Sequence, residues 1–236
     1  MKKWIVVFAC ILLTTTTVTA QDITLTSWTR AQYLGVNGAI FLDDPVVQTD
    51  LGLVWDNFYT NIWWSVGLDD SNLNSNFGDE VDLTLGWTES NGRFSWDTGL
   101  LYLEVVDLCR LHNDFVSLYA NGAYELNKSW SVYLRYEGYW KIDTADIGGG
   151  DFFMGGIKTS HALSPTTALT GHLTLMYDAG AFDLSEGWLW TGEWVFSHSF
   201  SDRLVGKVGC KLADQLTTND RREFEWIPEI GISYSF

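Results

Sequence analysis

Basic residues, proline and long apolar segments are scarce in this chain of 236 residues. It has 14 lysines and arginines against 30 aspartates and glutamates, so its formal net charge at pH 7 is −16. Because nucleic-acid binding requires a basic surface, this balance argues against a nucleic-acid partner. Beyond residue 20, no apolar run reaches the roughly 18 residues that indicate a transmembrane helix, and apolar residues rarely recur at helical spacing. The sequence therefore predicts no membrane-spanning helix.

Aromatic residues and glycine are abundant, whereas charge is low. Aromatic residues make up 15% of the chain and include 13 tryptophans, and there are 22 glycines but only 3 prolines. Charged residues make up 19%, below the share of about a quarter in an average soluble domain. This composition fits an all-β chain with an apolar outer surface better than a soluble helical enzyme.

The first 20 residues have the features of a secretory signal peptide. Lys2 and Lys3 give a positive start, Trp4–Leu13 is a short apolar segment, and Ala20 ends a plausible cleavage motif before Gln21. We expect this segment, residues 1–20, to be cleaved on export. Residues 21–236 would then form a single domain, which would be more acidic than the whole chain.

Over most of the remaining chain, apolar residues alternate with other residues at a period of two, as in half-buried β-strands. Turn sequences such as Ser90-Asn91-Gly92-Arg93 separate these runs, and tight turns alternate with longer polar connections. The pattern predicts about twelve strands, with ten as the alternative because residues 22–44 do not alternate cleanly. The predicted strands lie near 23–36, 45–55, 57–68, 80–89, 93–105, 113–125, 129–141, 151–163, 166–178, 187–200, 203–214 and 225–236.

The length of these predicted strands suits a lipid bilayer. A tilted transmembrane strand needs about 9–11 residues, whereas strands in soluble sheets average about five or six. Tryptophans also gather near strand ends, where the membrane–water interface favours them. The tryptophans that fit this rule are Trp87, Trp130, Trp140, Trp188 and Trp190, whereas Trp64 and Trp194 lie closer to mid-strand. We therefore expect an all-β fold, a transmembrane antiparallel up-and-down β-barrel, rather than the alternative of a secreted β-sandwich or jelly roll.

An even number of strands places both chain ends on one side of the membrane. For a barrel exported by a Gram-negative bacterium this side is the periplasm, so the tight turns should lie there and the long loops outside. The long connections are acidic, as with Asp69, Asp70, Asp143 and Asp146. Such loops would either favour cations at the outer mouth or bind divalent ions that bridge anionic lipopolysaccharide.

The last eight residues, EIGISYSF, resemble the sorting signal of outer-membrane barrels. In that signal a polar residue, a glycine, an aromatic residue and a terminal aromatic residue recur at fixed spacing, here Glu229-x-Gly231-x-x-Tyr234-x-Phe236. The resemblance implies that the barrel assembly machinery reads the C-terminal strand and inserts the protein into the outer membrane.

Residues 45–105 are similar to the TorF-type porins, a family of conserved hypothetical proteins also called Gcw_chp. The matching motifs are Pro45-x-x-Gln48, Phe58-Tyr59-x-x-x-Trp63, Glu80-Val81-Asp82-Leu83-x-x-Gly86-Trp87 and Asp97-x-Gly99-Leu100-Leu101-Tyr102. Where the family tends to carry Arg-Gly near its first strand, this chain has Leu34-Gly35. The resemblance therefore assigns no role to a first-strand arginine, and it implies an outer-membrane barrel that forms a pore.

If the apolar alternates face lipid, the other alternates face the lumen and include many ionisable residues. Ionisable groups at membrane depth need water or partners. They would either line a wet channel and bias which ions pass, or pair across strands and fill a narrow barrel. Since acids and bases occur in similar number, the lumen itself predicts weak selectivity. The expected lumen-lining charges are Asp50, Asp82, Asp97, Arg135, Glu137, Lys158, Glu193, Lys207, Lys211 and Glu229, with His172 among them.

The function expected from these patterns is an outer-membrane porin or channel for passive diffusion of small hydrophilic solutes or ions. A closed structural or adhesion barrel is the first alternative. The second is a lipid-modifying enzyme, which would need a serine next to a histidine base. Its candidate residues are Ser197-His198-Ser199, Ser160-His161, His112 and His172. His198 and His161 belong near the periplasmic turns, His112 has no adjacent serine and His172 stands alone, so we expect no enzyme activity. The histidines and cysteines show no metal-ligand spacing, so we expect no metal, and no motif calls for a cofactor.

Two cysteines, Cys109 and Cys210, lie outside the first 20 residues. An exported protein can oxidise such a pair to a disulfide. The predicted strand order places them about half the ring apart, whereas a disulfide needs Cα atoms roughly 6 Å apart. We therefore expect two free thiols, with Cys210 facing lipid.

Overall fold

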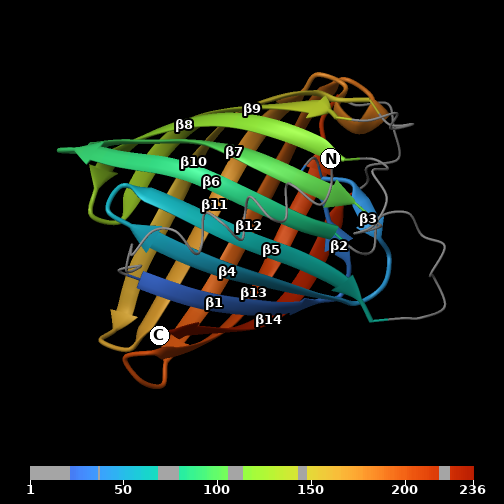
Figure 1. Cartoon of the computed structure of the whole chain (residues 1–236). Helices are drawn as coiled ribbons and strands as arrows, with labels where there is room; N and C mark the ends of the chain where they lie inside the picture. Colours follow the sequence, from blue (N-terminus) through green and yellow to red (C-terminus); the bar gives the residue numbers. More distant parts are fainter. Residues whose placement is uncertain (1–21, 37, 69–79, 106–113, 143–147, 218–223) are drawn as a thin grey trace, which may run out of the picture.

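The computed structural model describes residues 22–36, 38–68, 80–105, 114–142, 148–217 and 224–236, and it shows a closed antiparallel barrel (Figure 1). Each strand pairs with its neighbour along the chain, and β1 pairs with β14 to close the ring, with Leu25 opposite Tyr234 and Arg30 opposite Glu229. The twelve barrel strands confirm the predicted count and leave no free sheet edge. They are β1 (Asp22–Arg30), β4 (Val46–Trp55), β5 (Phe58–Gly67), β6 (Glu80–Asn91), β7 (Phe94–Val105), β8 (Phe115–Asn127), β9 (Trp130–Lys141), β10 (Gly150–Ser164), β11 (Thr167–Asp178), β12 (Gly187–Ser199), β13 (Leu204–Gln215) and β14 (Glu225–Ser235).

The two ends of the barrel differ as the turn spacing predicts. Short connections such as residues 92–93, 128–129 and 165–166 lie at the end that also carries the C-terminus, here called the turn end (Figure 1). The longer connections, such as residues 31–45 and 179–186, lie at the opposite end, here called the loop end. No helix in the described ranges is long and apolar enough to cross a membrane.

The outer wall of the barrel is apolar, and the alternation within each strand determines which side chains face it. Leu134 is 73% exposed and Ile230 61% exposed, and both lie on the outside of the ring. In the last strand Ile230, Ile232, Tyr234 and Phe236 follow this outer row, whereas Ser233 on the alternate row is buried. A barrel with such an outer band and a polar interior has the architecture of membrane-spanning β-barrels.

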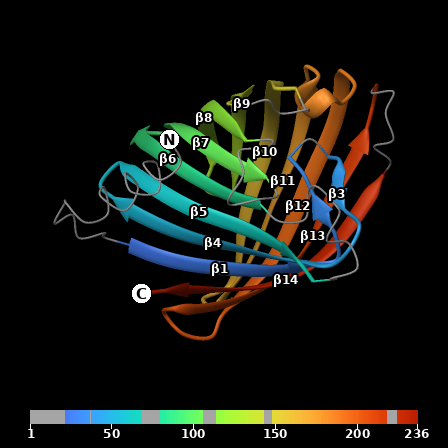
Figure 2. The ribbon, with the colours of Figure 1, turned by 45° about the vertical axis from the view of Figure 1, so that its right-hand side comes forward.

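The predicted first strand, residues 23–36, is too long. β1 ends at Arg30, and the chain then turns inward to form a small separate sheet of β2 (Tyr33–Leu34) and β3 (Ile40–Leu42). We call residues 32–36 and 38–43 the inward hairpin, and Figure 2 shows it inside the ring at the loop end. The strand pattern breaks here because Gly38 adopts a left-handed φ of 74°, which favours a turn.

Two lumen tyrosines lie flat against the wall over glycines of neighbouring strands. Tyr59 on β5 and Tyr119 on β8 approach each other across Gly86 and Gly99, and their hydroxyls are hydrogen-bonded. A Cβ atom at Gly86 would overlap the Tyr59 ring, and one at Gly99 would overlap the Tyr119 hydroxyl. Both glycines therefore provide the space that the rings occupy, which gives a physical reason for two of the glycines in the motifs above.

The substitution Gly86→Ala should lower the free energy of unfolding by about 1–3 kcal/mol, because it overpacks a site that has no free space. Urea unfolding of the refolded protein would measure the change. The matched control is Gly122→Ala, where an added Cβ would meet Phe94 at an ordinary 3.5 Å. If both variants lose equally little stability, the Tyr59 ring can move aside and the packing argument fails.

Candidate functional site in the barrel lumen

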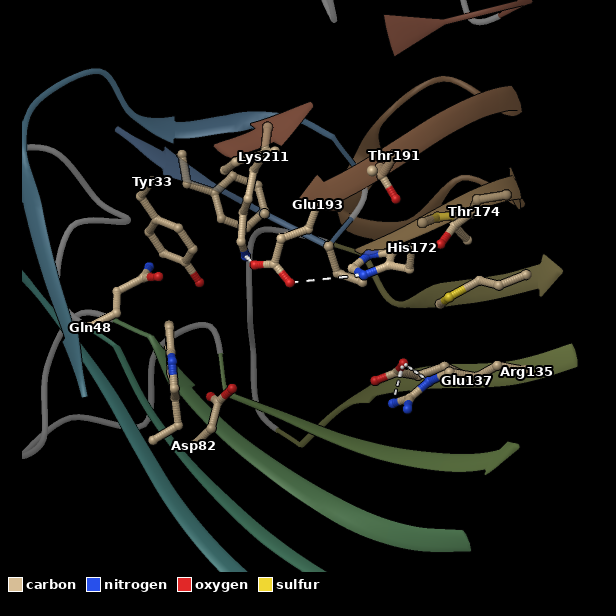
Figure 3. Close-up of a pocket in the computed structure, with 18 of the residues that line it drawn as sticks. Tyr33, Gln48, Asp82, Arg135, Glu137, His172, Thr174, Thr191, Glu193 and Lys211 are labelled. Atoms are coloured by element: carbon tan, nitrogen blue, oxygen red, sulfur yellow. Dashed lines mark hydrogen bonds and ion pairs between the residues drawn. The ribbon is translucent and has the colours of Figure 1, made fainter. Parts of the chain in front are cut away.

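A cavity of about 610 Å³ lies inside the ring and is lined mainly by polar and aromatic side chains (Figure 3). A second cavity of about 430 Å³ lies next to it toward the turn end. Lys158, His172 and Glu193 line both, so the two spaces adjoin. The charged residues that line the larger cavity are Arg30, Glu80, Asp82, Asp97, Arg135, Glu137, Lys158, Glu193 and Lys211.

The other predicted lumen charges, Asp50, Lys207 and Glu229, are not among the residues that line these two cavities. Asp50 accepts a hydrogen bond from the Asn61 amide, and Lys207 lies 5.5 Å from the centre of the Trp28 ring. The side chain of Glu229 is fully buried against Arg30. The role of any of these charges in ion passage stays a prediction.

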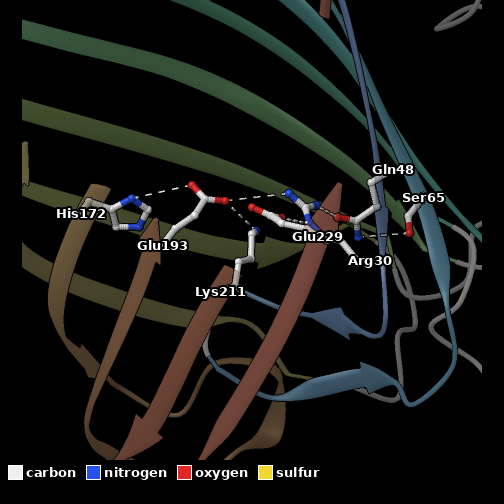
Figure 4. A network of polar contacts seen from close by, with 7 residues as sticks. All are labelled: Arg30, Gln48, Ser65, His172, Glu193, Lys211 and Glu229. Atoms are coloured by element: carbon white, nitrogen blue, oxygen red, sulfur yellow. Dashed lines mark hydrogen bonds and ion pairs between the residues drawn. The ribbon is translucent and has the colours of Figure 1, made fainter. Parts of the chain in front are cut away.

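One polar network runs across the seam where the first and last strands close the ring (Figure 4). At its centre Arg30 Nε donates to Glu229 Oε2 at 2.6 Å and Arg30 Nη1 donates to Gln48 Oε1. The Gln48 amide in turn donates to Ser65 Oγ at 3.3 Å. These contacts join β14, β1, β4 and β5 through a nearly fully buried arginine.

The same network extends along the other side of the seam through Glu193 on β12. One Glu193 oxygen lies 4.0 Å from Arg30 Nη2 and 3.9 Å from Lys211 Nζ, and the other lies 3.8 Å from His172 Nδ1. A single carboxylate thus meets three basic side chains from β1, β13 and β11. We call Arg30, Gln48, Ser65, His172, Glu193, Lys211 and Glu229 the seam network.

A second polar group lies on β5, β7, β8 and β9. Arg135 pairs with Glu137 at 2.8 Å and stacks over the Tyr119 ring, 4.4 Å from its centre. Glu137 also accepts a hydrogen bond of 2.7 Å from Tyr139, and Asp97 accepts one of the same length from Tyr59. The charge on Glu137 is therefore largely compensated by its own neighbours.

Arg30 is the functional candidate that the sequence analysis missed. The resemblance assigned no role to a first-strand arginine, and the predicted strand ran past this residue. In the structure Arg30 ends β1 and contacts Glu229, Gln48 and Glu193 of the seam network. Its strand was the least regular of the twelve, so no clear alternation marked Arg30 as facing inward.

At the loop end, the interior becomes apolar. A buried cluster joins Leu103, Phe115, Tyr139, Phe152, Met154, Met176, Ala181 and Leu189. Phe182, from the short 3-10 helix η2 (Ala181–Asp183), packs against this cluster with ring centres 5.2 Å from Phe115 and 5.0 Å from Tyr139. Its φ of 58° is uncommon for a bulky residue, and these ring contacts hold it there. We call this cluster and Phe182 the apolar layer.

The inward hairpin adjoins the apolar layer. Phe41 meets Phe182 with ring centres 6.3 Å apart, and Leu34 packs in a cluster with Ala213 and Ile227 of the wall. Tyr33 donates a buried hydrogen bond of 2.5 Å to Glu80. Burial raises the pKa of the Tyr33 hydroxyl well above its usual value, so the hydroxyl remains a donor.

The residues considered for lipid hydrolysis do not form a serine–histidine pair in the described part of the chain. His198 lies 3.1 Å from the Thr167 hydroxyl and His161 lies 2.8 Å from the Thr159 hydroxyl, whereas His172 faces Glu193. His112 and Cys109 lie outside the described residues. Cys210 is a free thiol.

Comparison with known proteins gives structural likenesses only. No family model matches the chain, and no curated protein matches it. The barrel resembles the KdgM porin in complex with disordered oligogalacturonate, at 14% identity and a TM-score of 0.59, over 91% of this chain and 99% of that one. It also resembles the NanC porin, at 12% identity and a TM-score of 0.61, over 90% and 98% of the two chains.

A third likeness is to the COG4313 outer-membrane channel from Pseudomonas putida F1, at 12% identity and a TM-score of 0.56, over 92% and 96% of the two chains. At such low identity these likenesses show the fold. The fold is that of outer-membrane β-barrels.

Proposed function

We propose that the protein is an outer-membrane channel for the passive diffusion of small hydrophilic solutes or ions. The observation that carries this proposal is the pair of adjoining cavities inside a closed ring, with charged side chains on their walls. A barrel that served only as a packed polar plug would have no need for such spaces. The likeness to proteins described as porins supports the same function.

Passage would depend on size exclusion and on the field of the lining charges. Within the described lumen, the bases Arg30, Arg135, Lys158, Lys207 and Lys211 are outnumbered by the acids Asp50, Glu80, Asp82, Asp97, Glu137, Glu193 and Glu229. Such rings of charge bias which ions pass, and salt screens them over about 8 Å at physiological ionic strength. The excess of acids favours a modest preference for cations.

In planar bilayers the folded protein should give stable ohmic current steps, with a modest preference for K⁺ over Cl⁻. The double substitution Asp82→Asn and Asp97→Asn should weaken that preference by removing two carboxylates from the cavity wall. Reversal potentials in a KCl gradient measure it. Glu89→Gln on an exposed wall position is the control. A silent bilayer with protein that shows the heat-modifiable gel shift of a folded barrel would contradict the channel.

The apolar layer and the inward hairpin favour a second candidate, a closed barrel with a structural or adhesion role. They place bulky side chains across the interior at the loop end, where a solute would enter. The bilayer experiment separates the two candidates, because only an open lumen carries current. Neither candidate gives the chain a catalytic residue.

The location and partners of the protein belong to the same proposal. The outer wall would contact outer-membrane lipid and lipopolysaccharide, and the barrel assembly machinery would read β14. Deletion of Phe236, an exposed outer side chain at the turn end, should sharply reduce folded protein in outer-membrane fractions. Normal amounts of heat-modifiable protein after the deletion would contradict the sorting signal.

Membership of the TorF-type porins remains part of this proposal and rests on the motifs within residues 45–105. Two residues of these motifs accept hydrogen bonds inside the barrel. Gln48 accepts one from Arg30, and Glu80 accepts one from Tyr33. An alignment of close relatives that lacked these residues would argue against membership. The predicted signal peptide, residues 1–20, lies outside the described residues.

A further inference from the structure

One arc of the lumen wall holds acids without bases, whereas the bases lie on the rest of the ring together with Glu137, Glu193 and Glu229. Asp50, Glu80, Asp82 and Asp97 belong to β4, β6 and β7, an arc with no inward base among its described residues. Arg135, Lys158, Lys207, Lys211 and Arg30 follow one another on β9, β10, β13 and β1. In the ring, β7 and β13 lie six strands apart, so Asp97 and the two β13 lysines belong to opposite walls. The lumen therefore carries a field directed across its axis.

The acidic arc has hydrogen-bonding capacity that the described residues leave unused. Asp82 Oδ1 and Asn121 Oδ1 are both buried and have no hydrogen-bond partner, and both residues line the larger cavity. Buried acceptors without partners are costly, so these two atoms favour a donor that enters the cavity. Asp97 lies directly opposite Asn121 in the register of β7 and β8, whereas Asp82 lies opposite Leu103, farther toward the loop end. A positively charged donor would suit Asp97 and Asn121 together.

Among the bases, Lys158 has an ammonium group that could bind a solute in the cavity. Lys158 Nζ lies 4.7 Å from the centre of the Tyr133 ring and makes no ion pair with a described residue. It lines both cavities, and it is close enough to Asp97 to interact with it electrostatically. Lys158 and the acidic arc thus present opposite charges to the same space.

From this arrangement we infer that the lumen selects small zwitterions, solutes that carry an ammonium and a carboxylate a few bonds apart, as amino acids do. The ammonium would bind at Asn121 and Asp97, and the carboxylate at Lys158. A plain cation or anion uses only one of the two walls, and a neutral hydroxylated solute gains no charge–charge attraction from either. This inference rests on the proposed channel function and specifies its solute class.

Liposome swelling with a pair of isomers tests the inference, because alanine is a zwitterion and lactamide is its uncharged isomer of closely similar size. After subtraction of swelling in protein-free liposomes, alanine should enter about threefold faster than lactamide, the order expected from weak, partly hydrated charge pairing. The substitution Asp97→Asn, and separately Lys158→Gln, should bring the ratio close to one. Glu89→Gln should leave the ratio unchanged.

The outcomes for the solute class and for the channel are separable. Equal rates for the two isomers through a protein that conducts in planar bilayers would overturn the zwitterion inference alone. A ratio that survives both lumen variants would also overturn it, because the named side chains would not be its cause. No current and no swelling with either isomer, from protein that passes the gel-shift test of folding, would overturn the channel and the inference together.

Discussion

Replacing Arg30 with methionine should lower the free energy of unfolding by about 3–5 kcal/mol, the range for removing one partner of a buried ion pair. The Arg30 guanidinium lies 2.6 Å from Glu229, whose side chain is fully buried. Without the cation, this carboxylate would stay buried without its ion-pair partner, and Gln48 would lose its donor. Urea unfolding in detergent or lipid, followed by the heat-modifiable gel shift, measures the loss.

Two further variants test whether the loss of stability comes from the broken ion pair with Glu229 or from removing an arginine at any position. Arg93→Met, in an exposed turn, is the matched control and should change stability little. Combining Arg30→Met with Glu229→Gln should recover most of the loss, because the unpaired charge is gone. A double variant no more stable than Arg30→Met alone would show that packing, rather than the buried charge, makes Arg30 important.

The seam network also shows what local sequence patterns leave undetermined. Arg30 and Glu229 are 199 positions apart, and no period of two relates them. They meet because β1 and β14 close the ring at a register that sets Arg30 opposite Glu229. Alternation placed Glu229 on the inward row of β14, but its partner follows from closure of the whole barrel.

The barrel itself could be predicted because every barrel strand has to present one row of side chains to each face. Because of this requirement, apolar residues alternate with other residues in 129–141 and 166–178. The strands β9 and β11 begin and end within one residue of these predicted ranges. The short turns could also be predicted, because they need residues that favour a positive φ, such as Gly92 with a φ of 63°. Architecture and sidedness follow from these local rules.

The apolar layer was not predicted, although consecutive apolar residues in two strands indicate that part of the interior is apolar. Leu100, Leu101, Tyr102 and Leu103 are consecutive, and so are Phe152 and Phe153, which makes both faces of these segments apolar. We interpreted the outward members as facing lipid and expected a polar inward row. The structure shows that the inward members, Leu103 and Phe152, pack with Phe182 from another connection. Long-range packing of a loop inside a barrel cannot be inferred from one strand.

Replacing the inward hairpin, residues 32–43, with a short glycine–serine linker should raise single-channel conductance several-fold. Tyr33, Leu34, Gly35, Val36 and Phe41 all line the larger cavity, so the deletion removes part of its lining. The replacement is geometrically simple, because β1 and β4 are adjacent strands with Arg30 opposite Val46. The closed ring and the seam network would stay intact. Current steps in planar bilayers measure the effect.

The control for the deletion is Tyr33→Phe, which removes only the hydroxyl that donates to Glu80 and should leave conductance nearly unchanged. Unchanged conductance in the folded deletion variant would show that the hairpin does not limit the path. The same deletion also decides between the two proposed functions. If the hairpin and the apolar layer close the native barrel, the native protein is silent and the variant conducts. If the native lumen is open, both conduct, and the ratio of their conductances measures how far the hairpin narrows the lumen.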